Sequence, residues 1–275
     1  MLGASTVTNV GTSSIVGNVG VRSSGGANAI TGFNSQPGAA VADPQVVGGN
    51  VHAGTSTVTP NAMQAQLQLT SARNNLSSLG AGTTLASADM VGLTLVPGVY
   101  TVTAGATNLS GTLILDGQGN ANAGWVFQMP GTLITSPNSQ VQLINSGAGA
   151  GVFWNVGSSA TLDSNTTFPG NILARASISF NSTASDLCGR ALADTGAVTL
   201  DHNSLAGTCT NLLLGSEGLN GGLDVITNPN GSDSVVFLPF APVTPRRGGT
   251  VPEPGSALLV RFALACLALA RRRRA

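Results

Sequence analysis

The chain has 275 residues, of which 42% are hydrophobic and only 8% are charged. A typical globular protein has about a quarter of its residues charged, and this chain contains no lysine. Five of the 11 basic residues and one acid lie in the last 25 positions, which leaves six basic and ten acidic residues in the body. This balance provides no basic patch and argues against nucleic-acid binding.

Uncharged polar residues and 37 glycines dominate the rest of the composition. Serine, threonine, asparagine and glycine suit stacked β-coils joined by many tight turns. The first residues, MLGASTVTNVG, lack the basic and apolar regions of a signal peptide. Because the C-terminus indicates export, we expect the natural chain to start before Met1.

Residues 2–58 predict short strands, and one amphipathic helix follows them. Segments such as SIVGNVGV and QVVGGNVHAG alternate apolar and small polar residues, then break at glycine or asparagine. Thr59 is the expected N-cap, Pro60 is the first helical residue, and Gly80 lies past the end. Apolar side chains recur at helical spacing in a stripe made by Ala62, Ala65, Leu69, Ala72 and Leu76. We expect this single helix, near 60–77, to pack against a larger body.

From Leu93 onward the pattern returns to strands and becomes repetitive. Leu162, Phe180 and Leu200 hold equivalent places in three similar phrases, at spacings of 18 and 20 residues. A period near 20 residues is typical of one coil of a β-solenoid, in which stacked coils bury a continuous core. A β-sandwich is the alternative, because it also has short strands with regular turns. The near-identical phrases favour the solenoid.

Cys188 and Cys209 are the two cysteines of the body, because Cys266 lies in the tail. Their separation of 21 residues corresponds to about one coil. Strands of adjacent coils lie about 4.8 Å apart, which is within the range of disulfide Cα separations. The pair is either a disulfide made in an oxidising compartment or two buried free thiols. We expect the disulfide after export.

The last part of the chain predicts a spacer and a sorting signal. Residues 215–250 lose the coil pattern and indicate a spacer or cap, which leaves 1–214 as the solenoid domain. The segment 251–275 combines three parts in order, namely the motif Pro252, Glu253 and Pro254, an apolar run, and four arginines. This order resembles the PEP-CTERM sorting signal of Gram-negative bacteria, and a plain C-terminal anchor is the alternative. The resemblance implies transient inner-membrane anchoring, cleavage by an exosortase, and release to the cell envelope or extracellular matrix.

The sequence contains no recognisable catalytic motif. His52 and His202 lack the spacing of metal ligands, and neither a nucleophile elbow nor a phosphate-binding loop is present. Asp163, Asp194 and Asp201 are the available acids for glycoside hydrolysis. Aspartate at a strand end commonly makes a turn instead. We therefore predict a non-enzymatic protein without a cofactor or a metal site.

The repeated coils also predict a regular outer surface, because alternate residues of a strand face outward. If Leu162, Phe180 and Leu200 point inward, small side chains project in stacked rows. These side chains are Ser164, Thr166, Ser182, Ala184, His202 and Ser204. A flat array of small hydroxyl and methyl groups holds water in an ordered layer without strong charges. That is the physical requirement for adsorbing to ice.

Phrases along most of the chain resemble the ice-binding-like β-solenoid family of bacteria and fungi. They are, in chain order, STVTNVGTSSIVGNVGV, MQAQLQLTSARNNL, LTLVPGVY, GTLILDGQGNANAGWVFQM, GVFWNVGSSATL, TTFPGNILARASI and CGRALADTGAVTLDHNSL. The resemblance covers residues 2 to about 210. It implies an all-β-dominated fold, an irregular right-handed β-solenoid (a triangular β-helix) with one long α-helix packed alongside. It also implies that N-terminal coils stack among later ones.

The same resemblance implies where the ice-binding face lies, because this family's face is described by threonine-rich four-residue phrases. The corresponding phrases are SNTT at 164–167, STAS at 182–185 and HNS at 202–204, which add Thr167 and Ser185 to the predicted face. Serine replaces threonine at several places, and His202 interrupts the row. Two hypotheses follow. The first is an exported ice-binding, antifreeze-type protein, and the second is a structural or adhesive protein of an extracellular polysaccharide matrix.

Overall fold

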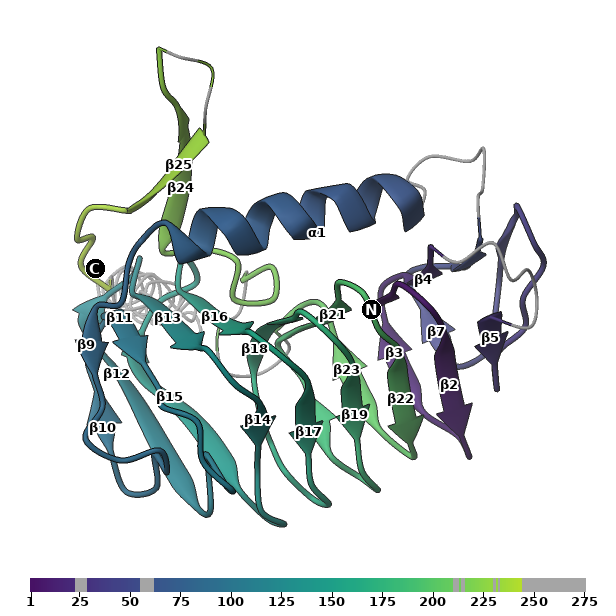
Figure 1. Cartoon of the computed structure of the whole chain (residues 1–275), viewed down its shortest axis with the longest axis horizontal. Helices are drawn as coiled ribbons and strands as arrows, with labels where there is room; N and C mark the ends of the chain where they lie inside the picture. Colours follow the sequence, from purple (N-terminus) through teal and green to yellow (C-terminus); the bar gives the residue numbers. More distant parts are fainter. Residues whose placement is uncertain are drawn as a thin grey trace, which may run out of the picture. The chain divides into compact units, whose positions relative to one another are not determined.

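Three walls of parallel strands enclose one core in the computed structural model (Figure 1). The structure describes residues 1–22, 29–54, 62–209, 213, 216–229, 231 and 233–243. A typical coil adds one strand to each wall in turn, so the predicted β-solenoid is confirmed and the β-sandwich is excluded. Within the described ranges, no helix is both long enough and apolar enough to cross a membrane. The predicted N-cap Thr59, Pro60 and the sorting segment 251–275 lie outside those ranges.

Sheet A is the largest wall and contains ten strands. In spatial order they are β6 (Ala40–Val41), β8 (Val51–Ala53), β4 (Val19–Val21), β1 (Leu2–Gly3), β21 (Gly189–Ala193), β18 (Gly170–Ala174), β16 (Gly151–Val156), β13 (Gly124–Met129), β11 (Gly98–Thr101) and β9 (Thr83–Thr84). Strand β6 pairs antiparallel with β8 at one edge, whereas the other pairs are parallel.

Sheets B and C form the other two walls. Sheet B contains, in spatial order, β14 (Leu133–Ile134), β17 (Ala160–Leu162), β19 (Ile178–Phe180), β22 (Val198–Asp201), β2 (Val7–Val10) and β5 (Ile30–Thr31). Sheet C has two parts, namely β10 (Thr94–Leu95), β12 (Thr112–Asn120) and β15 (Gln140–Ser146), then β20 (Ser185–Asp186), β23 (Ser204–Ala206), β3 (Ser14–Val16) and β7 (Val46–Val47). Isolated bridges through Thr167 connect the two parts.

Chain order and coil order differ. Strand β1 lies between β21 and β4, and Leu2 pairs with Leu192 on one side and with Gly20 on the other. Strand β2 likewise pairs with β22. The first coils therefore stack directly on the last ones, as the family resemblance implied, and the N-terminus lies near β21 in Figure 1.

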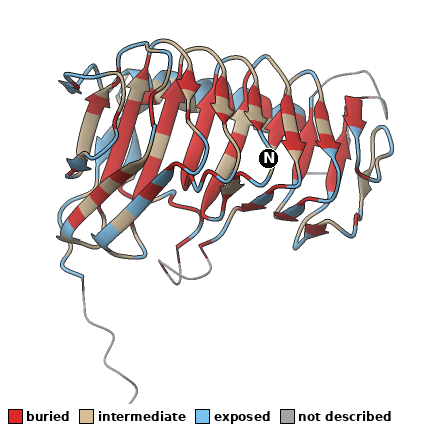
Figure 2. Cartoon of the chain, turned by 90° about the horizontal axis from the view of Figure 1, so that it is seen from below, coloured by how far each residue is buried: buried red, intermediate tan, exposed pale blue. Residues whose placement is uncertain are grey.

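The core is a column of inward side chains repeated from coil to coil. Leu162, Phe180 and Leu200 are at most 1% exposed, which confirms their inward orientation. An aromatic stack runs along the wider coils, with ring centroids 5.9 Å apart for Tyr100 and Phe127 and 4.0 Å apart for Phe127 and Trp154. Figure 2 shows the result, since buried residues form continuous bands across neighbouring strands. Each fully buried large side chain contributes about 2 kcal/mol of hydrophobic free energy.

Helix α1 (Ala62–Ser77) lies along the outer surface of sheet A (Figure 1). Its buried Ala62, Leu69 and Leu76 pack with outward side chains of the sheet such as Leu2 and Leu173. The predicted stripe is therefore confirmed. Gly80 has a φ of 79° just past the helix and donates its N–H to the Ser77 carbonyl, which is the conformation that glycine adopts most easily at a helix end.

Polar contacts also fasten the helix to sheet A, and the sequence did not reveal them. Gln66 is 1% exposed and donates from Nε2 to the carbonyl oxygens of Ala193 (3.1 Å) and Asp194 (2.7 Å). Arg73 forms an ion pair with the Asp194 carboxylate at 2.9 Å. These contacts fix the position of the helix along the coils, which apolar packing alone leaves less defined.

The described part of 215–250 lies along the edge where sheet C turns into sheet A. Residues 216–229 and 233–243, here called the corner strap, include an antiparallel hairpin of β24 (Leu223–Thr227) and β25 (Asp233–Phe237). Val152 donates its N–H to the Leu219 carbonyl, and Leu219 is 1% exposed. Gly151 allows this approach, because a Cβ there would collide with the Gly221 carbonyl oxygen. The solenoid and strap form one compact unit, Met1–Val243.

A disulfide joins Cys188, directly before β21, to Cys209, shortly after β23. The two Cα atoms are 4.5 Å apart, and the cysteines are 21 residues apart in the chain. The bond links neighbouring coils just before the chain leaves for the corner strap. A loop of this size corresponds to about 3 kcal/mol of stabilisation.

Candidate functional site

The outward side chains of sheet B form one straight row across six strands. Backbone pairing places Ile134 beside Thr161, Thr161 beside Ser179, and Ser179 beside Thr199. Thr8 follows Thr199, and Thr31 ends the row. Five of these six side chains carry a small hydroxyl group, and neighbours are about one strand spacing apart, roughly 4.8 Å.

The same strands fix this row rigidly from behind. Inward residues alternate with the row, and Ala160, Ile178 and Val198 are at most 1% exposed. Two further outward serines, Ser159 and Ser177, precede the row in their coils and accept hydrogen bonds from the backbone of the next coil. The hydroxyl row therefore stands on a packed core, with little freedom for the backbone beneath it.

A repeated turn connects sheet B to sheet C. One residue of each turn has a positive φ, namely Asn138 (64°), Asn165 (58°), Thr183 (63°) and His202 (54°). The N–H of each donates to a carbonyl of the next coil, for example Asn165 to Ser182 at 3.2 Å and Thr183 to Asp201 at 3.1 Å. Asparagine tolerates this left-handed conformation better than most residues.

These turns place the predicted surface residues in three different environments. Thr166 and Ala184 each follow a left-handed residue and are 0% exposed. The Thr166 hydroxyl lies 3.1 Å from the Thr135 hydroxyl and donates to the Ser136 carbonyl at 3.2 Å. The prediction that Thr166 and Ala184 project outward is therefore wrong. The left-handed residue interrupts the alternation of a strand and turns the next side chain into the corner.

Ser164 and Ser182 remain beside sheet B, on the outer part of the turn. Both line a shallow depression of about 440 Å³ that also includes Ser179 and Thr199 of the hydroxyl row. Asn181 and Asp163 lie at the same edge, and Asn181 Nδ2 donates to the Asp163 carboxylate at 2.9 Å. This bond, followed by the Ser164 N–H, lowers the pKa of Asp163 below its ordinary value.

Thr167, Ser185 and Ser204 lie on sheet C instead. Backbone pairing aligns them in one outward row of five residues across the wall, in the order Gln140, Thr167, Ser185, Ser204 and Ser14. Only isolated bridges connect Thr167 to its neighbours. Large apolar side chains are exposed on the same wall, with Val47 at 58% and Leu187 at 46%, and sheet B exposes Val10 at 54%. Sheet C is thus a less regular surface than sheet B.

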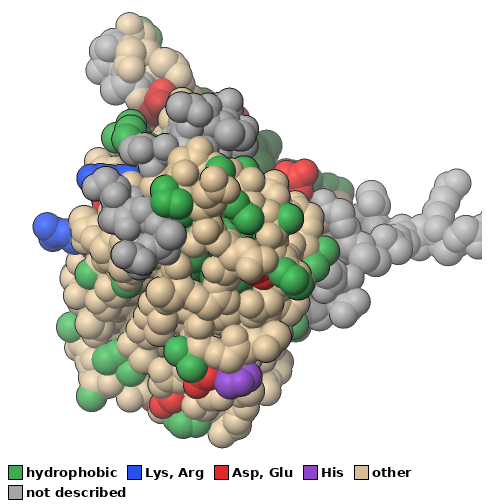
Figure 3. Space-filling model, turned by 90° about the vertical axis from the view of Figure 1, so that its right-hand side faces the viewer, with side chains coloured by type: hydrophobic (Ala, Val, Ile, Leu, Met, Phe, Trp, Pro, Cys, Tyr) green, Lys and Arg blue, Asp and Glu red, His purple; other side chains and the backbone are tan. Residues whose placement is uncertain are grey.

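Charged groups are few around these walls. His202 lies on the turn, with its Nδ1 2.6 Å from the Asp201 carboxylate and both side chains substantially exposed. Figure 3 shows the end of the solenoid next to β5, where uncharged side chains dominate the visible described surface. Asp194, a candidate acid, is instead the helix anchor for Arg73. The described residues include no group of three or more histidine, cysteine or acidic side chains arranged for a metal ion.

The hydroxyl row of sheet B was not among the surface residues predicted from the sequence. Its residues are the middle members of short triplets, ATL at 160–162, ISF at 178–180 and VTL at 198–200. In each triplet two buried side chains flank one outward hydroxyl. That recurring pattern was visible in the sequence, whereas the in-register continuation through Thr8 and Thr31 depends on the non-sequential coil order.

Known proteins are similar to this chain in sequence and in fold. The family model described as ice-binding-like matches residues 1–206. An ice-binding protein of Nostoc sp. strain HG1 is 43% identical over 209 residues, covering 76% of this chain and 71% of the relative. Among solved structures, an ice-binding protein of the Antarctic ascomycete Antarctomyces psychrotrophicus is 33% identical, with a TM-score of 0.63 over 76% of this chain and 94% of that one. A domain of Shewanella frigidimarina ice-binding protein 1 is 28% identical, with a TM-score of 0.64 over 77% and 93%.

Proposed function

The chain belongs to the ice-binding-like family, and we propose that it adsorbs to ice through sheet B. The function is that of an ice-binding, antifreeze-type protein. The observation that carries the assignment to sheet B is the row of hydroxyl side chains from Thr161 to Thr31, held in register across neighbouring strands.

Adsorption to a crystal requires many weak contacts that form together. Threonine supplies a methyl group, which disfavours disordered water, and a hydroxyl group, which hydrogen-bonds to ordered water. Because the row stands on a packed core, few conformational degrees of freedom are lost when it meets a surface. No lysine or arginine stands in the row to hold a strong hydration shell of its own.

The other two walls are less suitable. α1 covers the outward leucines of sheet A. Sheet C is interrupted near Thr167. It also exposes three large apolar side chains, Val47, Ile144 and Leu187, whereas sheet B exposes Val10. Sheet B has neither a covering element among the described residues nor a break in its strand order.

A matched pair of variants tests the assignment, because Thr161 and Thr167 lie in the same coil on different walls. Thr161→Tyr places a bulky ring in the sheet B row, whereas Thr167→Tyr places the same ring on sheet C. We expect Thr161→Tyr to raise the concentration that stops ice recrystallisation about tenfold, equivalent to about 1.4 kcal/mol of lost adsorption free energy. Thr167→Tyr should stay close to wild type.

The reverse ranking, measured on variants with unchanged thermal unfolding, would move the site to sheet C. A folded wild-type chain that leaves ice crystals round and recrystallisation unchanged would contradict ice binding itself. That result would favour the structural or adhesive role in an extracellular polysaccharide matrix.

We further propose that the solenoid winds right-handed and that the protein is exported without any catalytic role. The order of parts at 251–275 supports a PEP-CTERM signal, with Pro252, Glu253 and Pro254 presented to an exosortase of a Gram-negative bacterium. The Cys188–Cys209 disulfide supports passage through an oxidising compartment. Mass spectrometry of the natural protein should find the final arginines removed. A soluble cytoplasmic form that retains them would contradict export.

A further inference from the structure

A groove separates α1 from the hairpin of the corner strap, above the outer surface of sheet A. Its volume is about 640 Å³, within the range of small-molecule sites. Helix residues such as Ser71 and Ala72 form one side, and hairpin residues such as Leu223 and Val225 form the other. This groove lies on a different wall from the hydroxyl row of sheet B.

The floor of the groove is apolar along three adjacent strands. Leu192 of β21, Leu173 of β18 and Phe153 of β16 line it from below. Neighbouring strands lie about 4.8 Å apart, so this floor extends about 10 Å. Hydrocarbon placed there would bury apolar surface on both partners.

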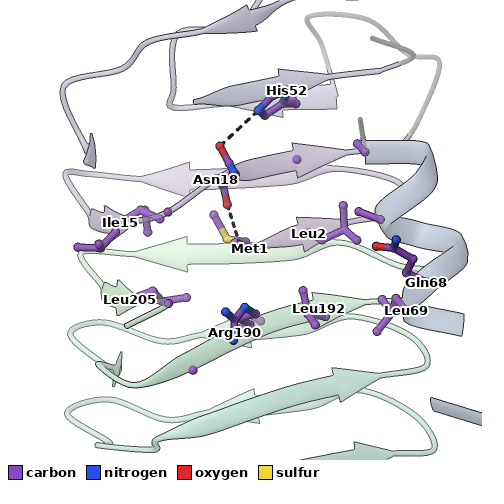
Figure 4. A pocket seen from close by; sticks show the side chains of 18 of the residues that line it. Met1, Leu2, Ile15, Asn18, His52, Gln68, Leu69, Arg190, Leu192 and Leu205 are labelled. Atoms are coloured by element: carbon purple, nitrogen blue, oxygen red, sulfur yellow. Dashed lines mark hydrogen bonds between the residues drawn. The ribbon is translucent and has the colours of Figure 1, made fainter. Parts of the chain in front are cut away.

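Arg190, on β21 next to Leu192, brings a single guanidinium group to the groove. Its Nη1 donates to the side-chain oxygens of Asn171 (3.1 Å) and Asn220 (2.5 Å), and to the Glu217 carbonyl (3.4 Å). Arg190 also borders a neighbouring cavity of about 600 Å³ beside Met1, where Figure 4 shows Arg190 and Leu192 on the same strand. The acceptors of Nη1 are all neutral oxygens.

The other arginine of this wall provides a contrast. Arg73 is paired with the Asp194 carboxylate at 2.9 Å, whereas Arg190 has no carboxylate within ion-pair distance among the described residues. Burial lowers the pKa of Arg190, and the negative charges of Asp186 and Glu217 partly oppose this shift. Burial also raises the pKa of Asp186 well above its ordinary value. A carboxylate is a favourable partner for a partly buried guanidinium, because it accepts two parallel N–H···O hydrogen bonds from it. Asp233, on the hairpin side, is bonded to Thr227 at 2.8 Å.

We infer that this groove binds a small amphipathic carboxylate, such as a medium-chain fatty acid, with its head on Arg190 and its chain along Leu192, Leu173 and Phe153. The Arg190 guanidinium, which has no carboxylate within ion-pair distance among the described residues, gives the head group its charge complement. The apolar floor accepts the chain. The site is independent of ice adsorption, because it lies on sheet A.

Isothermal titration calorimetry of the full chain with sodium decanoate tests this site. We expect one decanoate per chain, weaker binding of decanol, and no binding of decyltrimethylammonium, whose head is positive. Arg190→Gln should weaken decanoate binding about tenfold and leave decanol nearly unchanged, because only the charged head loses its partner. Arg175→Gln, which removes an exposed arginine elsewhere, is the matched control.

A second pair of variants leaves Arg190 in place, because Arg190 also holds the corner strap. Ser71→Trp fills the groove from the helix side and should abolish binding of decanoate. Asn74→Trp places the same ring on an exposed helix position outside the groove and should bind like wild type. Equal binding of decanol and decanoate, decanoate binding that survives Ser71→Trp, or no binding by the wild type would each overturn the proposal.

Discussion

Sheets A and B are both long ladders of coil strands over the same core, yet within the described residues only sheet A is covered. Outward positions of sheet A carry Leu2, Leu173 and Leu192, and α1 and the corner strap pack over that wall. Outward positions of sheet B carry hydroxyl side chains such as Thr161 and Thr199, and no element of the described ranges lies over them. The inward residues specify the coil, and the outward row decides what each wall contacts.

The outward surface of sheet C is intermediate in character between those of sheets A and B. It has a hydroxyl row through Ser14, Ser185 and Ser204, but its strands are interrupted and Leu187 is exposed beside them. A hydroxyl row alone therefore does not distinguish the walls. Continuity of the row distinguishes sheet B from sheet C, because the rigid lattice of ice can be matched only by a surface that is itself regular over several strands.

The largest expected effect is on stability, and it distinguishes the buried turn between sheets B and C from the exposed surface of the sheets. Thr166→Tyr forces a ring into a fully buried turn and removes the contact of Thr166 with the Thr135 hydroxyl. Overpacking of this kind costs about 3 kcal/mol at the upper end of its usual range. We expect a lower urea midpoint for Thr166→Tyr than for Thr167→Tyr, whose side chain is exposed. Equal midpoints would show that the corner is not packed as described.

A second substitution weakens the attachment of α1 to sheet A and leaves the residues of sheet B unchanged. Asp194→Ala removes the carboxylate that holds Arg73 at 2.9 Å and Thr70 at 2.7 Å. Loss of charged hydrogen bonds at a mostly buried site should cost about 2 kcal/mol. The expected result is a lower thermal midpoint with unchanged ice activity per folded molecule. Ice activity that falls further than the folded fraction would mean that sheet A takes part in adsorption.

The sequence predicted the parts of the fold that follow a simple period. The helix stripe of Leu69 and Leu76 and the inward Leu162 needed only local spacing. The surface assignment failed where the chain leaves that period, since the left-handed Asn165 turns Thr166 inward. The asparagines at turn positions were a usable signal for these corners. The neighbourhood of Arg190 was not predictable, because it depends on the corner strap returning from beyond residue 215.

A smaller effect concerns the edge of sheet B. Hydrogen bonds from Asn181 and then from the Ser164 N–H lower the pKa of Asp163. The ionised carboxylate therefore stabilises the fold above its unfolded-state pKa of about 3.9, and this contribution is lost as pH falls through the folded pKa. Because the group is exposed, the effect is small. Urea midpoints should fall less between neutral and acid pH in Asp163→Asn than in wild type. An identical pH dependence of the urea midpoint in both proteins would show that the ionised Asp163 carboxylate does not stabilise the fold.

Variants on two walls of the same two coils test adsorption through sheet B most directly. Thr8 pairs with Thr199 on sheet B, and Ser14 pairs with Ser204 on sheet C. The double variant Thr8→Tyr/Thr199→Tyr breaks the hydroxyl row, and Ser14→Tyr/Ser204→Tyr is its matched control. The measurement is the fraction of folded protein that partitions into slowly growing ice. The sheet B variant should be excluded from the ice while the sheet C variant enters it like wild type. Incorporation of the sheet B variant, with exclusion of the sheet C variant, would contradict adsorption through sheet B.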